Sequence, residues 1–379
     1  MNITFLLGNG FDIGLGLKTG YENFYNEYSQ TQATDNENIN SFKTMLGNRD
    51  TDDQKKIIDW SDFEKAFGQH SSDFTIEEKM DYIERFEDFV ANFNIYLENE
   101  EKRIDFSNTD LIAKTMNTAV TTYYHIRTAD REAVQNIYTS ADRNRTYNFI
   151  SFNYTKSVDE CARILKQHLK SDNSRDVGKV LHIHGFVEEN MIMGVNDASQ
   201  ITNEVFANDE DVVREIVKPQ QNSDVRANYE KQVIDTINSS NIICVYGMSI
   251  GETDKKWWSH IAQWLSKSEK RALVILKYDK KYNKRFPFVQ NRFIDSVTNK
   301  FLELSEQPQD LQAAIRSRVF VGMNHNVFSM SICKKTKKEA TLLDNIEAAE
   351  KTIMYLNEHG DLVAKASEVA GKAKEFAIK

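Results

Sequence analysis

The sequence predicts an α/β fold, a Rossmann-like doubly wound parallel sheet that carries a large helical insertion and ends in a helical C-terminal tail. Three observations lead to this prediction. The apolar run 3–7 breaks directly into a glycine-rich turn, a helical stretch follows over 21–145, and strand-like runs then alternate with helical patterns. Strands that alternate with helices form parallel sheets, because each crossover places a helix on a face of the sheet.

The glycine-rich turn has the spacing G-x-G-x-x-x-G, formed by Gly8, Gly10 and Gly14. Glycines at such a turn accept positive φ and let a phosphate approach backbone N–H groups. The spacing differs from the G-x-G-x-x-G of dinucleotide folds, and the sequence has no G-x-x-x-x-G-K-[ST], which disfavours hydride-transfer enzymes and P-loop NTPases. The turn therefore indicates either a nucleotide site or a tightly packed connection.

The helical stretch has aromatic and aliphatic residues at three- and four-residue spacing, which is typical of a helix face packed on a core. We expect residues 50–53 to form a loop and cap before a helix that contains Trp60, Phe63 and Phe67. The clearest apolar stripe consists of Ile83, Phe86, Phe89, Val90, Phe93 and Leu97. The expected division is a nucleotide-binding core of residues 1–20 and 146–330, a helical insertion of 21–145, and a helical tail of 331–379.

The later strand-like runs are short and apolar, as expected for strands buried on both faces of a parallel sheet. They cover residues 147–152, 180–183, 191–195, 242–246, 272–278 and 318–321. Helical patterns lie between them at 155–169, 228–238, 255–265, 289–302 and 310–316. The tail from Lys334 is a charged helical pattern that suits packing on the core or on a partner helix.

Composition excludes several classes of protein. The 379 residues include 57 acidic and 48 basic ones, and the resulting net charge of −9 repels a nucleic-acid backbone. No run approaches eighteen consecutive apolar residues, and the N-terminus leads directly into a strand. Cys161, Cys244 and Cys333 are isolated, so they form neither a disulfide framework nor a zinc pair. We expect a cytoplasmic protein that binds no nucleic acid, membrane or metal.

Four predicted strands end in unusually polar residues. In an open α/β sheet, ligands collect beyond the carboxyl ends of the strands, so these ends predict a binding site. They are Gly8-Asn9-Gly10, Ser151-Phe152-Asn153-Tyr154-Thr155, His182-Ile183-His184-Gly185 and Tyr246-Gly247-Met248-Ser249, with Asp254 following.

These ends, in this order, resemble the sirtuin-like superfamily, and the whole chain resembles the AbiH family of bacterial phage-defence proteins. Against the sirtuin motif GAGxSxxxGIPxFR, residues 8–21 read GNGFDIGLGLKTGY, with Asp12 in place of serine. Residues 151–153 match the sirtuin TQN segment, 184–185 its His-Gly pair, and 247–249 its Gly-Thr-Ser. The likeness to AbiH proteins covers the opening LLGNGFDIGLGLKTGY, the segment WSDFE over 60–64 and FNYT over 152–155.

The resemblance implies an NAD site. In sirtuin-like defence proteins that degrade NAD, an asparagine and a histidine at the positions of Asn153 and His184 cleave the nicotinamide–ribose bond. Asn153 would orient water or the ribose hydroxyls, and His184 would take a proton from either. We expect Asp12 either to contact the ribose or water or to cap the next helix. The resemblance implies these positions for binding NAD: Gly8, Asn9, Gly10, Phe11, Asp12, Thr19, Tyr154, Gly185, Gly247, Met248 and Ser249.

Two departures limit the likeness to sirtuins. The sirtuin aspartate two places after the asparagine is Thr155 here, and the zinc-binding cysteine pairs are absent, so we do not expect a protein deacylase. We expect His182 to be a core residue, because a regular strand points it away from the face of His184. Residues 324–326, Asn-His-Asn, are expected near the adenosine side.

Three functions remain open at this point. The first is an abortive-infection effector that hydrolyses NAD and is controlled by a phage-derived trigger, a partner protein or assembly into a homo-oligomer. The second is a sensor that binds NAD or an NAD-derived nucleotide without chemistry and switches a helical region. The third is a metal-dependent hydrolase that uses Asp12 and His184.

Overall fold

The computed structural model describes residues 1–31, 34–48, 62–121, 125–140, 144–225, 227–282, 285–335 and 346. Residues Met1–Ile332 form one compact unit and Cys333–Lys379 a second. The expected loop at 50–53, Trp60 and nearly all of the expected helical tail lie outside the described residues. No helix in the described part of the chain has the length and apolar character needed to cross a membrane.

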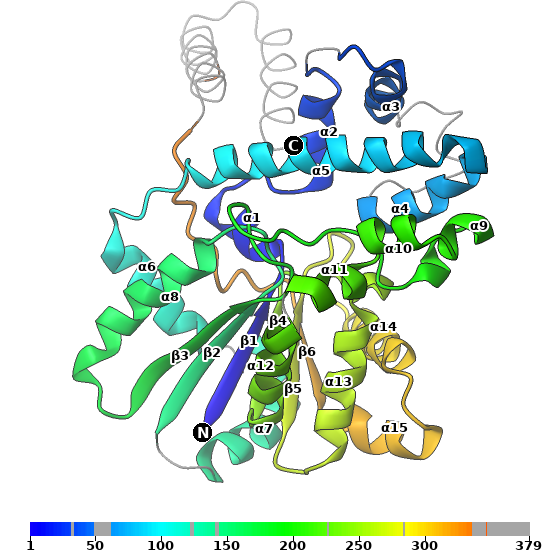
Figure 1. The fold of residues 1–379 in the computed structure, drawn as a ribbon. Helices are drawn as coiled ribbons and strands as arrows, with labels where there is room; N and C mark the ends of the chain where they lie inside the picture. Colours follow the sequence, from blue (N-terminus) through cyan, green and yellow to red (C-terminus); the bar gives the residue numbers. More distant parts are fainter. Residues whose placement is uncertain are drawn as a thin grey trace, which may run out of the picture. The chain divides into compact units, whose positions relative to one another are not determined.

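A parallel sheet forms the centre of the larger unit (Figure 1). Its strand order is β3-β2-β1-β4-β5-β6, and every pair of neighbours is parallel. This is the order of a Rossmann-like doubly wound sheet, and the α/β prediction is confirmed. The described strands are β1 (Asn2–Leu7), β2 (Arg145–Ser151), β3 (Arg175–His182), β4 (Ile242–Tyr246), β5 (Ala272–Lys277) and β6 (Val319–Met323).

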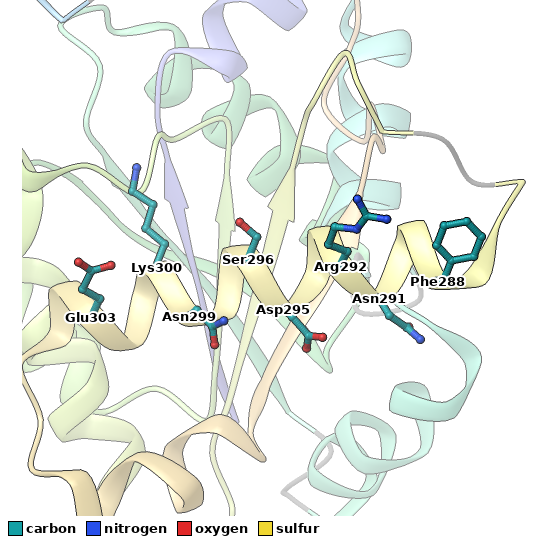
Figure 2. Close-up of a pocket in the computed structure, with 8 residues that line it drawn as sticks. All are labelled: Phe288, Asn291, Arg292, Asp295, Ser296, Asn299, Lys300 and Glu303. Atoms are coloured by element: carbon teal, nitrogen blue, oxygen red, sulfur yellow. The ribbon is translucent and has the colours of Figure 1, made fainter.

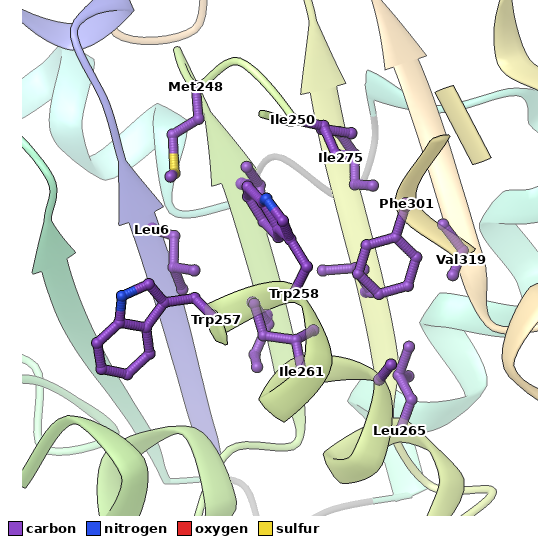
Figure 3. Close-up of a cluster of buried hydrophobic side chains, with 14 of the residues drawn as sticks. Leu6, Met248, Ile250, Trp257, Trp258, Ile261, Leu265, Ile275, Phe301 and Val319 are labelled. Atoms are coloured by element: carbon purple, nitrogen blue, oxygen red, sulfur yellow. The ribbon is translucent and has the colours of Figure 1, made fainter. Parts of the chain in front are cut away.

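Helices cover both faces of this sheet, which explains why its strands are apolar throughout. On one face Leu6 belongs to a hydrophobic cluster with Trp258 of α13 and Phe301 of α14 (Figure 3). On the other face Phe5 packs against Phe328, with ring centroids 6.0 Å apart. The helices that follow β2 are α8 (Ser157–His168), α9 (Glu204–Ala207), α10 (Glu210–Ile216), α11 (Lys218–Val225), α12 (Ala227–Asn238), α13 (Lys255–Ser266), α14 (Pro287–Ser305) and α15 (Gln309–Arg316), which confirms the five helical patterns expected there.

The strand expected over residues 191–195 is wrong. This segment is irregular, and its N–H groups bond to the connection around it: Ile192 donates to His184 at 2.8 Å and Val195 to Ile216 at 2.8 Å. Met193 and Val195 are buried in a second hydrophobic cluster, away from the sheet. A short apolar run does not reveal whether its side chains are covered by a sheet or by helices, and here helices cover them.

That second cluster forms a helical layer from two separate parts of the chain. Five residues of the apolar stripe on α5 are buried as expected and Val90 is partly buried. Phe89 stacks on Phe63 with ring centroids 3.5 Å apart. Val195 and Phe206, from the connection between β3 and β4, join the same cluster. The helices before β2 are α1 (Gly10–Leu15), α2 (Tyr21–Tyr28), α3 (Glu37–Gly47), α4 (Phe63–His70), α5 (Lys79–Glu101), α6 (Thr109–Ala119) and α7 (Thr128–Ser140).

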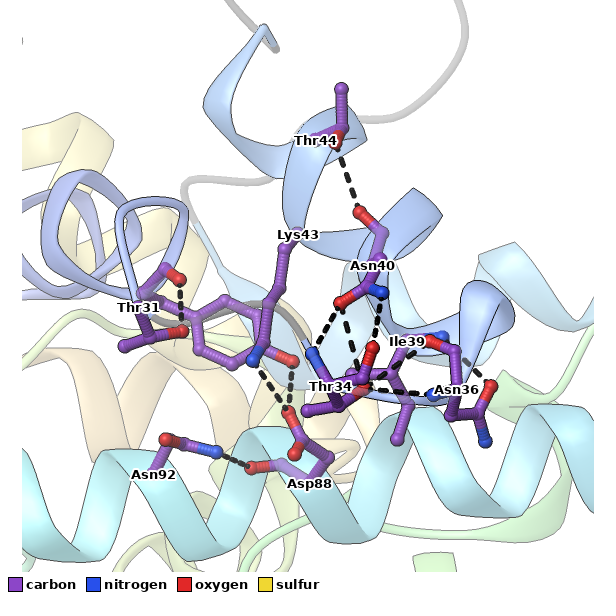
Figure 4. A network of polar contacts seen from close by, with 10 residues as sticks. Thr31, Thr34, Asn36, Ile39, Asn40, Lys43, Thr44, Asp88 and Asn92 are labelled. Atoms are coloured by element: carbon purple, nitrogen blue, oxygen red, sulfur yellow. Dashed lines mark hydrogen bonds and ion pairs between the residues drawn. The ribbon is translucent and has the colours of Figure 1, made fainter.

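Polar contacts fix α2 and α3 to the long helix α5. Asp88 accepts a hydrogen bond from Tyr28 at 2.7 Å and lies 4.0 Å from the Lys43 ammonium (Figure 4). Asn36 caps α3 by accepting from Asn38 N–H at 2.9 Å. The helix α6, in contrast, packs beside α8 next to the sheet, so residues 21–145 do not form a separate compact body.

The glycine turns after β1 and β4 touch through their backbones. A Cβ built on Gly10 would lie 2.4 Å from Gly247 Cα, and one on Gly247, whose φ is +69°, would lie 2.7 Å from Gly10 Cα. Gly10 N–H donates to Gly247 O at 2.9 Å. The strand order reverses between β1 and β4, so this contact lies at the topological switch point of the sheet.

We expect Gly247→Ala to lower the free energy of unfolding by about 2–5 kcal/mol, because a Cβ there both strains a positive φ and collides with the β1 turn. Gly251→Ala is the matched control in the same loop. Its Cβ would lie 3.5 Å from the nearest atom, and the expected change is within about 0.5 kcal/mol. Urea unfolding of the three proteins measures this, and equal midpoints for both variants would contradict the assigned contact.

Candidate functional site

A cavity of about 780 Å³ lies at the carboxyl ends of β1, β2, β3 and β4. One side of its wall comes from residues that follow β1, β2, β3 and β4, and the rest comes from α2, α4, α5, the start of α11 and the end of α14. Its described lining consists of Gly8, Asn9, Asp12, Ile13, Thr19, Gly20, Tyr21, Glu22, Asn23, Asp62, Glu64, Lys65, Phe93, Leu97, Phe152, Asn153, Tyr154, Thr155, His184, Lys218, Gly247, Met248, Ser249, Gly251, Glu252, Thr253, Asp254, Lys300, Glu303 and Leu304.

Both residues expected to carry the chemistry, Asn153 and His184, line this cavity. Most of the positions expected to bind NAD line it as well, namely Gly8, Asn9, Asp12, Thr19, Tyr154, Gly247, Met248 and Ser249. The sheet therefore brings together residues from four separate parts of the sequence. Parallel strands make this possible, because their carboxyl ends meet at one edge.

Three of the expected binding positions lie outside the lining. Gly10 N–H donates to Gly247 O, and Phe11 N–H donates to Gly8 O at 2.8 Å, so neither N–H points to a ligand in this structure. The Phe11 ring is fully buried against Phe328. Gly185 has φ +70° and packs against the Asn190 carbonyl.

A second hollow, of about 830 Å³, runs along α14 (Figure 2). All of its described lining residues belong to that one helix, from Phe288 to Glu303. Small-molecule sites are concave and are usually built from several elements, which favours the cavity at the strand ends. The two hollows share Lys300 and Glu303.

Asp12 links the first helix to the start of α8. Its carboxylate accepts hydrogen bonds from Thr155 Oγ1 at 2.8 Å and Ser157 Oγ at 2.5 Å. It does not cap the next helix, since the N-cap of α2 is Gly20. Burial raises the pKa of Asp12 to about 6, although the two hydroxyl groups oppose this shift.

Asn153 is buried at the end of β2, and its backbone N–H donates to Ser151 Oγ at 3.2 Å. Its side-chain Nδ2 approaches Asp12 closely enough to lower the pKa of that carboxyl, yet it makes no hydrogen bond of normal length and angle. A buried donor without such a bond costs about 1–3 kcal/mol. This nitrogen is therefore suited to donate to a molecule in the cavity.

His184 follows β3 and is 6% exposed. Its Nε2 lies 3.4 Å from Asp254 Oδ1. The centroid of its ring lies 5.7 Å from that of the Phe152 ring and 6.2 Å from that of the Tyr154 ring. Burial and then the Lys218 charge lower the pKa of His184, and Asp254 only partly opposes them, so the imidazole is neutral at pH 7. Its Nδ1 is buried and has no hydrogen-bond partner among the described residues.

The helical layer contributes a buried ion pair to the same cavity. Lys218 Nζ lies 2.7 Å from Glu64 Oε2, and both side chains are less than a tenth exposed. Glu64 also accepts from the Tyr154 hydroxyl at 3.1 Å. Sequence reasoning assigned no role to this pair. Glu64 lies in the WSDFE segment that resembles AbiH proteins, whereas no sequence pattern singled out Lys218.

The comparison with protein families decides the assignment. Residues 4–276 match the family model described as "Bacteriophage abortive infection AbiH". The chain belongs to the AbiH family. No curated protein matches the chain. The match to AbiH extends from β1 into β5 and therefore includes all four polar strand ends.

Other candidate residues of this AbiH chain lie outside the cavity lining. His182 is buried, with its Nε2 2.6 Å from Asp159 Oδ2 on α8. Asn324 donates through Nδ2 to the Asp279 carbonyl at 2.8 Å, and His325 lies beside His125, with ring centroids 4.9 Å apart. Among the described residues, no three His, Cys, Asp or Glu side chains are grouped to hold a metal ion.

Lys218→Met should lower the free energy of unfolding by about 3–5 kcal/mol, because it leaves the buried Glu64 charge without its partner. The double variant Glu64→Gln, Lys218→Met should recover much of this loss. Lys65→Met is the control, since Lys65 pairs with Glu252 at 2.9 Å in an exposed position, and it should cost no more than about 1 kcal/mol. Additive losses in the double variant, measured by denaturant unfolding, would refute the coupling.

The pKa of Asp12 predicts a pH-dependent stability. Since its pKa is about 6 in the folded protein against an ordinary value of 3.8, the folded state holds the proton more tightly. Its stabilising contribution is complete below pH 4 and is lost as the pH rises through 6, by about 3 kcal/mol in total. The difference in unfolding free energy between wild type and Asp12→Asn should change by this amount between pH 4 and pH 7. A difference that does not depend on pH would show that folding does not raise the pKa of Asp12.

Proposed function

We propose that this AbiH-family protein acts in phage abortive infection by hydrolysing NAD at the nicotinamide–ribose bond. The observation that carries the proposal is the meeting of Asn153 and His184 in one cavity at the switch point of a Rossmann-like sheet. Each keeps a buried side-chain nitrogen that lacks a hydrogen bond of normal geometry. Few buried polar atoms lack such a bond, and because both residues line the cavity, these two nitrogens are available to a bound ligand.

The reaction separates charge in a way that suits the lining. The bond between ribose C1′ and the nicotinamide nitrogen breaks, its electron pair leaves with neutral nicotinamide, and positive charge develops on the ribose. Water then adds to C1′ and loses a proton. The described lining carries three lysines against seven carboxylates, Asp12, Glu22, Asp62, Glu64, Glu252, Asp254 and Glu303, and negative groups stabilise a developing cation in a partly buried site.

His184 is the proposed general base. A neutral imidazole accepts a proton, and the lowered pKa of His184 keeps it in that form at pH 7. The proton comes from the attacking water or from a ribose hydroxyl. Asn153 Nδ2 is the proposed donor that holds the water or the hydroxyl in place.

The diphosphate of NAD would lie at the two touching turns. Asn9 and Ser249 line the cavity there, and the Asn9 amide is held by a hydrogen bond from the Thr19 hydroxyl. Because Lys218 is paired with Glu64 and Lys65 with Glu252, we assign the diphosphate to neutral polar groups of these turns.

A sensor that binds NAD without cleaving it would use the same turns. A sensor would not need both a neutral histidine, His184, and an amide donor, Asn153, in the same cavity. Their presence together favours catalysis. Loss of NAD in the cell distinguishes the two functions directly.

The test is cellular NAD measured by mass spectrometry after phage challenge, in cells that express wild type, Asn153→Ala or His184→Ala at matched levels. We expect NAD to fall in wild type, with each variant slowing its loss by about 100-fold or more. His168→Ala, an exposed position at the end of α8, should behave as wild type. Unchanged NAD in wild-type cells that are nevertheless protected from phage would refute the hydrolase and favour the sensor.

A further inference from the structure

We infer that Asp254 is a positioning residue that fixes the tautomer of His184, so that Nε2 carries the hydrogen and Nδ1 is the nitrogen that accepts the proton during catalysis. This inference rests on the proposed function for its catalytic consequence. The tautomer itself can be measured without any activity.

One ring nitrogen of His184 faces Asp254, and the other is buried in a residue that lines the cavity, whereas His182, whose Nδ1 also lacks a described partner, lies outside that lining. Asp254 Oδ1 lies 3.4 Å from Nε2, and Nδ1 has no hydrogen-bond partner among the described residues. An ionised carboxylate only accepts hydrogen bonds, so a neutral histidine facing it must present its N–H. The hydrogen on Nε2 leaves a lone pair on Nδ1.

The surroundings keep Asp254 ionised and His184 neutral. Burial alone would raise the pKa of Asp254, but the hydrogen bond from His184 and the Lys218 charge outweigh it and lower this pKa. The charged groups that act on His184 are Asp254 at the end of the β4 loop, Lys218 on α11 and Glu64 on α4. The pair therefore holds one negative charge on Asp254 and none on the imidazole.

Asp254 lies at a point where the chain is anchored to the core. It ends the short 3₁₀ helix Glu252–Asp254 and directly precedes α13, whose Trp257 and Trp258 are buried in the sheet cluster. Its side chain is 16% exposed. A carboxylate anchored in this way restricts rotation of the His184 ring, as a triad aspartate does for its histidine.

The neighbouring pair His182 and Asp159 provides an internal control. His182 also directs Nε2 to a carboxylate, at 2.6 Å, but neither residue lines the cavity. A change at Asp159 should alter the His182 signals and leave His184 and activity unaffected.

The first experiment is long-range ¹H–¹⁵N NMR of full-length protein labelled at its eight histidines, with His184→Gln used to assign the signals. We expect wild-type His184 to be neutral at pH 7 with its hydrogen on Nε2, and Asp254→Ala to give a mixture of tautomers. Unchanged His182 signals show that this variant is folded. A hydrogen on Nδ1 in wild type, or identical tautomer populations in Asp254→Ala, would overturn the inference.

The second experiment measures kcat and KM for NAD. Asp254→Asn should lower kcat by about 100-fold with little change in KM, and Asp159→Asn should match wild type. Since Asp254 raises the pKa of His184, its loss should also move the acidic limb of the pH profile to lower pH. A wild type that does not cleave NAD even in extracts of phage-infected cells would refute the proposed function, while the NMR result still decides the tautomer. An active wild type with full activity in Asp254→Asn would refute the positioning role alone.

Discussion

The backbone contact between Gly10 and Gly247 is the constraint on which the rest of the site depends. These turns follow the two strands between which the sheet reverses its order, and a side chain on either glycine would push them apart. Their contact sets the floor of the cavity and fixes the directions in which β1 and β4 continue. From β1 the chain enters α1, which carries Asp12, and from β4 it reaches Asp254.

The helical layer completes the cavity by charge as well as by shape. Lys218 and Glu64 come from helices that lie far apart in the sequence, yet they form one buried ion pair beside the strand ends. The Lys218 charge also lowers the pKa values of both His184 and Asp254. The pKa of the proposed base, His184, is therefore set partly by a residue outside the sheet. The helical layer must be packed on the sheet before His184 has this lowered pKa.

The sequence allowed the sheet and its polar edge to be predicted, because apolar runs and the polar residues after them are local signals. Asn153 and His184 could be placed in one site for this reason, since parallel strands end at a common edge. The position of Lys218 could not be predicted, because it depends on how the connection between β3 and β4 folds under the helices. The same packing explains the wrong strand at 191–195. Local patterns also did not reveal that the Gly10 N–H bonds to the turn after β4 and that the Phe11 N–H bonds within its own turn, to Gly8 O.

The placement of β1 in the sheet limits how early the site can fold during synthesis of the chain. This first strand pairs with β4, and the contact of Asn2 with Asn241 spans 239 residues. A chain still on the ribosome cannot close the floor of the cavity until β4 has emerged, and pairings over such distances form slowly. For a protein whose proposed reaction consumes a cofactor of its own host, late assembly means that incomplete chains do not carry a finished site.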